Sequence, residues 1–323
     1  MAHKEQISIG MAGDVMIGRL VNDCLNEVPL TYLWGDLLPL FKSCDLNLIN
    51  LEAALTKNLE AVPKVFNFKA DPEKVLALIE ASVHVVNLAN NHVLDYSEKG
   101  LLETLETLDR AHILHVGAGR NAKEAKQAVI VSRQGIRIGF LGCTDNEPSW
   151  MATQNRPGIR FIDVGDLEAI EEEIKQLRPQ VDLLILSMHW GPNMRERPPS
   201  YFVDFAHRLI ETGVDIIHGH SAHIFQGVEF YKEKLILYDT GDFVDDYYVD
   251  PYLRNDRSFF FIVEADKQGM LNLRLVPVLI SNCQVNRAQG KEASETLLRM
   301  KRLSEEMKTA LTLENGELTK KLR

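Results

Sequence analysis

Residues 181–191, which read VDLLILSMHWG, decide the fold of this chain. Residues 181–188 form a mostly apolar run, and His189 follows it directly. A run of this length is typical of a strand buried on both faces, as in a parallel sheet covered by helices. Residues 214–217 repeat the pattern and lead into His218-Gly219-His220. We therefore expect both runs to be strands of an α/β sheet, with polar residues where they end.

Strand-like and helix-like segments alternate through the first two thirds of the chain. Further strands are expected over residues 7–12, 45–51, 83–88 and 113–116, and helices over residues 30–41, 72–81, 96–111, 167–177 and 201–212. Hairpins over residues 128–143, 228–239 and 258–279 would add antiparallel strands. This alternation predicts a mainly parallel sheet in one α/β domain. We place the domain at residues 5–285, followed by a charged C-terminal helix and tail at residues 286–323.

The composition is that of a globular protein with an excess of acidic residues. The 323 residues carry a formal net charge of -10, which favours solubility and argues against nucleic acid as a partner. The four cysteines lie far apart, so neither a disulfide framework nor a structural zinc site is expected. The sequence has no apolar stretch of the ~20 residues that a membrane span needs, and its polar first residues do not resemble a signal peptide. We expect a cytoplasmic protein.

Polar residues follow the ends of five of the expected strands. They are Asp14, Glu52, Asn91 with His92, His189, and His220 with His223. Because the carboxyl ends of parallel strands meet at one edge of a sheet, these side chains are expected to converge. Carboxylate, amide oxygen and imidazole together bind borderline or hard dications such as Mn, Fe, Zn or Mg. The sequence thus predicts a site for one or two divalent metal ions.

Each of these residues has another interpretation when it is taken alone. Asp14 after a glycine is a common helix cap, residues 90–92 suit a simple turn, and His189 suits a buried structural histidine. Glu52 is harder to explain in that way, because a carboxylate at the end of a buried strand needs a partner. Three histidines within residues 218–223 are seldom structural, although which of them would bind metal stays open. Their shared position at strand ends favours the metal site.

Six ordered motifs over residues 7–250 resemble the poly-gamma-glutamate capsule synthesis protein CapA family. They are Gly13-Asp14-Val15-Met16-Ile17-Gly18-Arg19, Asn50-Leu51-Glu52, Ala89-Asn90-Asn91-His92 with Asp95 and Gly100, His189-Trp190-Gly191, Gly219-His220-Ser221-Ala222-His223 and Tyr238-Asp239-Thr240-Gly241-Asp242-Phe243. That family is similar to a branch of the calcineurin-like metallophosphoesterases. The resemblance implies a four-layer α/β/β/α sandwich with mixed sheets and a centre of two metal ions.

The resemblance also implies a role for each matching residue. Asp14 and His223 would bind the first metal, and Glu52 would bridge the two metals. The second metal would be completed by the remaining ligands, Asn91, His189 and His220. Two such ions can hold a bridging hydroxide that attacks a phosphoryl group, so no separate strong base is needed.

Three further residues are catalytic candidates. The resemblance makes His92 the general acid or transition-state stabiliser, and Asp95 belongs to the same motif. Arg19, which follows Asp14 closely, could meet an anionic substrate group, with a surface salt bridge as the equal alternative. The sequence departs from the family's pattern at Met16, where the related phosphoesterases have a histidine.

Two other departures lie late in the chain. Ser221-Ala222 stand where the family tends to have a proline before the second histidine, and the family's Gly-Asn-Phe segment has Asp242 in place of asparagine. His218 is a candidate for supporting a ligand instead of binding metal itself.

Three functions are compatible with these features. The first is a metal-dependent hydrolase of the phosphoesterase type that uses metal-bound hydroxide on an anionic small molecule or polymer. The second is a component of poly-gamma-glutamate capsule synthesis or export, as the family name implies. The third is a non-catalytic, metal-dependent binder of an anionic polymer, which His92 beside a full ligand set disfavours.

Overall fold

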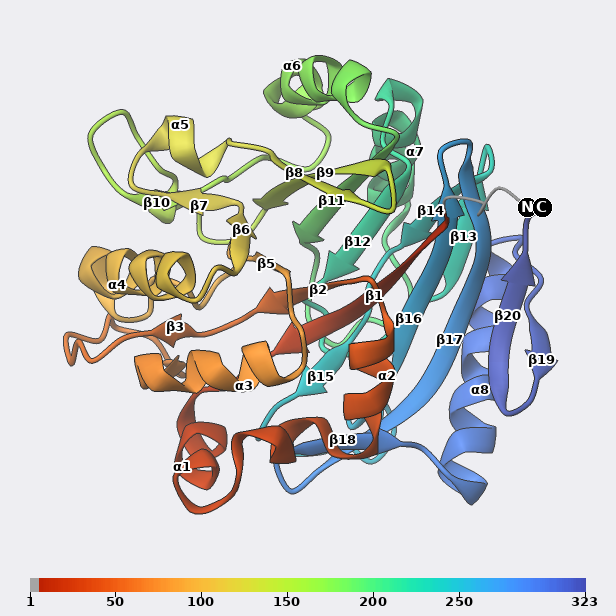
Figure 1. The fold of residues 1–323 in the computed structure, drawn as a ribbon, viewed down its shortest axis with the longest axis horizontal. Helices are drawn as coiled ribbons and strands as arrows, with labels where there is room; N and C mark the ends of the chain where they lie inside the picture. The colour runs from red at the N-terminus through yellow and green to blue at the C-terminus, as the bar shows by residue number, and fades with distance from the viewer. Residues whose placement is uncertain (1–5) are drawn as a thin grey trace.

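Two β-sheets pack face to face at the centre of the computed structural model, which describes residues 6–323. The polar residues expected before the first strand therefore lie, apart from Gln6, outside the described part, as does the first residue of the expected domain. The large sheet has the order β19-β20-β17-β16-β1-β2-β5-β6, with β15 paired to β1 and β18 paired to β17. The smaller sheet has the order β13-β14-β12-β11-β9-β8 (Figure 1).

The bounds of the strands are as follows. The large sheet contains β1 (Gln6–Val15), β2 (Leu46–Leu51), β5 (Val85–Asn87), β6 (Leu114–Val116), β15 (Asp242–Val244), β16 (Arg257–Asp266), β17 (Gly269–Ser281), β18 (Gln284–Arg287), β19 (Thr312–Glu314) and β20 (Glu317–Lys321). The smaller sheet contains β8 (Val129–Arg133), β9 (Ile136–Thr144), β11 (Leu183–His189), β12 (Ile216–His220), β13 (Val228–Tyr231) and β14 (Lys234–Leu237). Two short pairs join β3 (Ala54–Leu55) to β4 (Lys69–Ala70) and β7 (Ala118–Gly119) to β10 (Gly158–Ile159).

Helices cover the outer face of each sheet. The α-helices are α1 (Arg19–Glu27), α2 (Leu38–Ser43), α3 (Val75–Glu80), α4 (Ser97–Arg110), α5 (Ala122–Ala125), α6 (Glu168–Leu177), α7 (Ser200–Thr212) and α8 (Gly290–Glu306). Short 3-10 turns are η1 (Leu30–Leu37), η2 (Pro72–Lys74), η3 (Pro148–Trp150) and η4 (Arg178–Gln180). None of the helices in residues 6–323 is long and apolar enough to cross a membrane.

Alternation along the buried strands creates three apolar cores and therefore four layers. In β11, Leu183 and Ile185 belong to the core between the two sheets. Leu184 and Leu186 alternate with them and belong to a second core beneath α6 and α7. A third core lies between the large sheet and α1 to α4 on the opposite side of the molecule (Figure 1). The predicted α/β/β/α sandwich with mixed sheets is confirmed.

Parallel pairing brings the carboxyl ends of the strands together. In the large sheet β1, β2, β5 and β6 pair in parallel, and in the smaller sheet β9, β11, β12 and β14 do so. β15 also pairs in parallel with β1, with Asp242 opposite Asp14. Polar residues at these strand ends are thus held by the backbone ladders of both sheets.

The helix expected over residues 30–41 is broken, and this prediction was wrong. η1 contains Gly35 at φ 44° and ψ -133°, and α2 begins only at Leu38. A left-handed φ of this kind favours glycine because a Cβ is strongly disfavoured there. A Cβ at Gly35 would also lie 2.2 Å from Asn286 Oδ1, so the close approach of β18 requires glycine.

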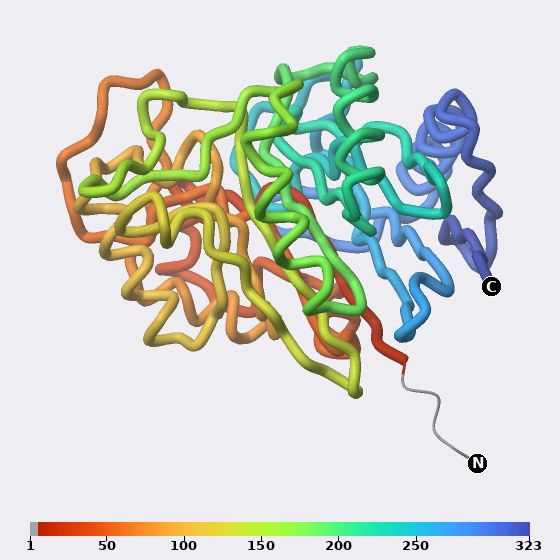
Figure 2. The backbone as a smooth tube through the Cα atoms, turned by 90° about the horizontal axis from the view of Figure 1, so that it is seen from above, coloured from red at the N-terminus to blue at the C-terminus, as the bar shows by residue number. Residues whose placement is uncertain are grey.

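The C-terminal segment is part of the sandwich. The charged helix expected within residues 286–323 is α8, which ends at Glu306 and places Leu297 and Met300 in the core between the sheets. After it, β19 and β20 form a hairpin across Asn315-Gly316, and β20 joins the edge of the large sheet. Both turn residues have a left-handed φ, 52° and 80°, as a type I′ turn requires. Figure 2 shows this segment at the opposite end of the molecule from α3 and α4.

Candidate metal centre

The strand ends bring together the side chains that the sequence predicts as ligands. Asp14 is the last but one residue of β1, and Glu52 directly follows β2. His189 and His220 are the last residues of β11 and β12 and lie opposite each other in that ladder. Because these strands come from both sheets, the side chains meet where the two sheets face each other.

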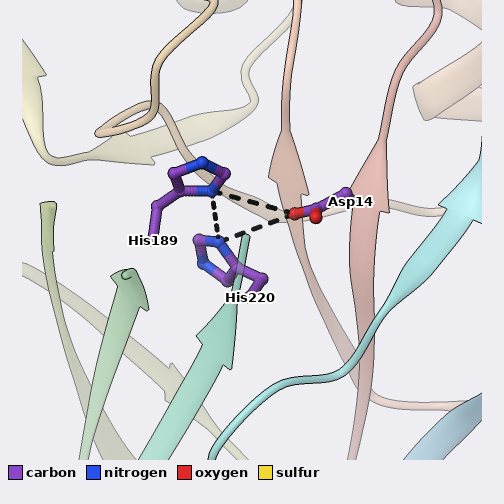
Figure 3. Close-up of side chains that lie close together, drawn as sticks. All are labelled: Asp14, His189 and His220. Atoms are coloured by element: carbon purple, nitrogen blue, oxygen red, sulfur yellow. Dashed lines mark hydrogen bonds and ion pairs between the residues drawn. The ribbon is translucent and has the colours of Figure 1, made fainter. Parts of the chain in front are cut away.

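A first group of donors consists of Asp14, His189 and His220, whose ligand atoms lie within 4.8 Å of one another. Asp14 Oδ1 lies 3.6 Å from His220 Nδ1 and 3.9 Å from His189 Nδ1. The two imidazole nitrogens are 3.0 Å apart, and all three side chains point toward one another (Figure 3). Glu52 Oε2 and Asn91 Oδ1 complete the surroundings of His189, at 4.0 Å from its Nδ1 and 3.0 Å from its Nε2.

A second group consists of Asp14, His223 and Asp242, again within 4.8 Å of one another. Asp14 Oδ2 lies 3.5 Å from His223 Nδ1, and Asp242 Oδ1 lies 2.8 Å from the same nitrogen. Asp14 therefore belongs to both groups, with one oxygen directed to each. Sequence reasoning gave Asp242 no role, although its place in the last of the six motifs was a signal.

Two buried carboxylate oxygens at this site have no hydrogen-bond partner among the described residues. Glu52 and Asp242 are fully buried, yet Glu52 Oε1 and Asp242 Oδ2 have no hydrogen-bond donor among the described residues. Leaving a buried charged oxygen unpaired is costly, and native proteins rarely do so without a reason. A divalent cation bound beside each of these atoms would satisfy it, so the residues present fit a metal centre.

Burial raises the pKa of the carboxyl groups at this site and lowers the pKa of the imidazoles. Burial raises the pKa of Asp14, and burial together with the negative charge of Asp14 raises the pKa of Glu52 well above its usual range. Burial lowers the pKa of His189 and His220 well below the usual value, so both rings are neutral at pH 7. Neutral imidazole is the form that binds metal.

We expect the buried carboxyl groups to lower the stability of the metal-free protein as the pH rises toward 7. Burial raises the pKa of Glu52 and Asp242 well above the ordinary carboxyl value. It also raises the pKa of Asp245 to about 7. The folded state therefore keeps protons on these groups at pH values where the unfolded chain has released them. Such groups give stability that is present below about pH 4 and lost as the pH rises through their folded pKa. The buried histidines act oppositely, but their contribution is complete above their ordinary pKa of about 6.5.

Thermal unfolding of chelator-treated protein should therefore show these carboxyl groups lowering the Tm between about pH 4 and pH 7, a range that ends at the pKa of Asp245. Saturating Mn²⁺ should reduce this fall, because a bound cation favours the ionised carboxylates. Equal slopes with and without Mn²⁺ would contradict the assignment of these carboxylates to a cation site.

His92 and Asp95 form a hydrogen-bonded pair at the edge of the centre. His92 Nδ1 lies 2.5 Å from Asp95 Oδ2, and His92 Nε2 lies 3.7 Å from Glu52 Oε1. Asp95 also accepts from the backbone N–H of Phe68 at 2.7 Å and from Lys64 Nζ at 2.9 Å. Lys64 was missed by sequence reasoning because it lies in an irregular stretch with no motif. The hydrogen bond to Asp95 holds Nδ1 of the His92 ring and directs its Nε2 toward Glu52.

Arg19 lies beside the centre without touching its carboxylates. Its guanidinium stacks over Phe66 at 4.8 Å and Phe68 at 5.1 Å, and its Nε lies 3.4 Å from Asp246. Phe68 in turn packs edge-on against His92. One guanidinium nitrogen of Arg19, Nη1, is buried without a partner among the described residues. The ion pair agrees with the salt-bridge alternative, while the unpaired nitrogen leaves a donor for an anionic group.

Two further residues support the ligands. His218 has both ring nitrogens engaged, by Ser187 Oγ and by the carbonyl of Ala12, each at 3.0 Å, so neither is available to a metal. Ser187 Oγ also lies 3.0 Å from His220 Nε2 and orients that ring. Asn50 donates to Asp14 Oδ1 at 2.8 Å and to Glu52 Oε2 at 3.2 Å, which holds the two carboxylates side by side. Met16 is buried in the core under α1 to α4 and joins neither donor group.

Comparison with known proteins identifies the family of this chain. A probable polyglutamine synthesis accessory protein of Mycobacterium tuberculosis is 31% identical over 87% of this chain and 87% of its own length. The capsule biosynthesis protein CapA of Bacillus anthracis is 32% identical over 75% of this chain and 60% of its own length. Among solved structures, a hypothetical protein from Thermus thermophilus matches with a TM-score of 0.49 and 15% identity over 87% of this chain and 96% of that chain. The family model described as bacterial capsule synthesis protein PGA_cap matches residues 8–247, and the chain belongs to that family.

Proposed function

We propose that this protein is a metal-dependent hydrolase that cleaves phosphoester-type bonds of an anionic substrate. The observation that carries the proposal is the pair of donor groups that share Asp14, with His92 Nε2 directed at them. The first group offers His189, His220 and one oxygen of Asp14, with Glu52 and Asn91 adjacent, and the second offers His223, Asp242 and the other oxygen of Asp14. When bound, divalent cations supply a Lewis acid and lower the pKa of water to near neutrality.

The protein's own groups would handle the proton and the substrate. His92 Nε2 would hand a proton to the oxygen that leaves phosphorus, while Asp95 accepts the hydrogen bond from Nδ1 and fixes the ring. Lys64 ties Asp95 in place and also bonds the carbonyl of Asn91, so it couples the pair to a proposed ligand. Arg19 would bind an anionic group of the substrate through its unpaired nitrogen.

A direct assay tests the proposal. Purified protein supplied with Mn²⁺ should hydrolyse a generic aryl phosphate monoester or diester, and chelation should remove the activity until Mn²⁺ is restored. The proposal fails if metal-loaded protein, with its metal content verified by elemental analysis, turns over none of a broad panel of phosphate esters.

A role in poly-gamma-glutamate metabolism is the second candidate, and the relatives favour it. One is named a polyglutamine synthesis accessory protein and others capsule or PGA biosynthesis proteins. In this role the substrate would be an anionic polymer or a group attached to it. Co-purification with polymer synthase subunits, or loss of polymer in a deletion strain, would support it. A strain that lacks the gene and makes normal polymer would count against it.

A purely binding role is the third candidate. The buried hydrogen-bonded His92–Asp95 pair disfavours it, because metal-dependent binding of an anion needs no positioned proton donor. If the protein only binds, polymer affinity should depend on metal while the polymer length stays constant during prolonged incubation.

A further inference from the structure

We infer that Asp242 is a metal ligand, and that with Asp14 and His223 it forms an oxygen-rich cation site that prefers Mn²⁺ or Mg²⁺. The inference deepens the proposed function, since it takes the presence of a metal centre as given. It adds a ligand that the sequence pattern did not predict and a difference in chemical character between the two donor groups.

The backbone fixes Asp242 beside Asp14. β15 pairs in parallel with β1, and the two aspartates are partners in that ladder. Asp242 is fully buried, its Oδ1 lies 2.8 Å from His223 Nδ1, and its Oδ2 has no hydrogen-bond donor among the described residues. A carboxylate placed in this way has one oxygen directed at a neighbouring donor and another free to bind a cation.

The charges around Asp242 require a counter-charge. Asp14 is the partner of Asp242 in the β1–β15 ladder, and Asp239 and Asp245, three residues to either side of Asp242, are buried as well. Such buried carboxylates repel one another unless a proton or a cation lies between them. His223 supplies one imidazole to this acidic cluster, and a divalent cation would supply the rest.

The chain directly after β1 offers no alternative donor. Met16, two residues after Asp14, is buried in the apolar core under α1 to α4. At this end of the centre, the additional donor beside Asp14 is therefore Asp242, which lies on β15. Asp242 is distant from Asp14 in the sequence and adjacent to it only in space.

The two donor groups differ in hardness. The first contains two imidazoles and one carboxylate oxygen, whereas the second contains one imidazole and two carboxylates. Nitrogen-rich sites suit zinc or iron, and oxygen-rich sites suit manganese and magnesium. We therefore expect the centre to accept Zn²⁺ first at His189 and His220, and Mn²⁺ at Asp242.

Metal titration of the full chain tests this inference. Chelator-treated wild type should bind two equivalents of Mn²⁺, counted by elemental analysis after desalting and by electron paramagnetic resonance of the free ion. Asp242→Asn, which keeps the size of the side chain, should bind one equivalent, with the second weakened by more than about 10-fold. His220→Ala is the matched opposite variant, and it should keep the Mn²⁺ that Asp242 holds. Protein loaded with one equivalent of Zn²⁺ should still take up one Mn²⁺ in wild type and none in Asp242→Asn.

Thermal unfolding without metal separates a ligand from a structural residue. Removing one of several repelling carboxylates should leave the Tm of metal-free Asp242→Asn equal to that of wild type or higher. A lower Tm together with loss of both equivalents would show that Asp242 supports the fold, and would overturn the inference. So would two equivalents bound by Asp242→Asn at wild-type affinity, or a single equivalent bound by wild type in excess Mn²⁺. Wild type that binds one ion and hydrolyses esters would refute the inference alone, whereas wild type that binds none would refute the proposed function as well.

Discussion

The His92→Ala variant is expected to hydrolyse aryl phosphate about 10²- to 10⁴-fold more slowly than wild type while keeping the wild-type metal content. His92 lies outside both donor groups, so its loss removes no proposed ligand. Its Nε2 nevertheless faces Glu52 Oε1 at 3.7 Å, which places the ring at the edge of the centre. The loss should fall mainly on kcat, because a proton donor acts in the transition state and contributes little to ground-state binding.

Asp95→Asn distinguishes the catalytic role of His92 from a structural one. Burial lowers the pKa of His92, while the hydrogen bond and negative charge of Asp95 raise it. Without that charge the pKa of His92 falls further, so the alkaline decline of kcat should begin at a lower pH in Asp95→Asn than in wild type. His207→Ala, in which a half-buried histidine paired with Glu229 is lost, is the control and should keep full activity. Wild-type kcat in His92→Ala with full metal content would remove this histidine from the mechanism.

Much of the fold and most of the candidate ligands could be predicted from local sequence. The strands β1, β2 and β11 are mostly apolar, and each has, at or next to its end, a polar residue that lies in the centre. The end of a buried strand can be predicted because the strand itself is mostly apolar. A polar residue after such a run indicates that the chain is leaving the apolar core. For β12, the sequence predicts the end of the strand at residue 217, three residues before β12 ends at His220, but the convergence does not depend on that boundary.

The parts that were missed depend on contacts between distant segments. Asp242 becomes a neighbour of Asp14 only because β15 pairs in parallel with β1. No local sequence pattern predicts this pairing. Lys64 reaches Asp95 from an irregular loop, where periodicity gives no information. The break at Gly35 follows from the close approach of β18, which lies some 250 residues further along the chain. The hairpin across Asn315-Gly316 is different, because that dipeptide between two segments of alternating apolar and polar residues is a local signal for a turn.

Asp14→Ala is expected to remove both metal equivalents and reduce hydrolysis to the background rate. Asp14 is present in both donor groups, with Oδ1 facing His189 and His220 and Oδ2 facing His223. Each ion would lose a charged ligand, and the two groups would lose the carboxylate that links them. By comparison, His220→Ala weakens only the first group. The loss of activity should therefore be larger than in any variant confined to one group.

The test measures metal per chain by elemental analysis after dialysis against about 10 µM Mn²⁺. Wild type with the affinity of an ordinary enzyme metal site should be loaded at this concentration. Asp215→Asn is the matched control, because Asp215 is also a buried carboxylate but lies at the other end of β12, paired with Arg178 and Lys234. That control should keep both ions even if its Tm falls, so loss of metal in Asp14→Ala cannot be ascribed to the mere removal of a buried charge. Two ions retained by a folded Asp14→Ala variant would show that the centre is not organised around this residue, and the shared-ligand arrangement would have to be abandoned.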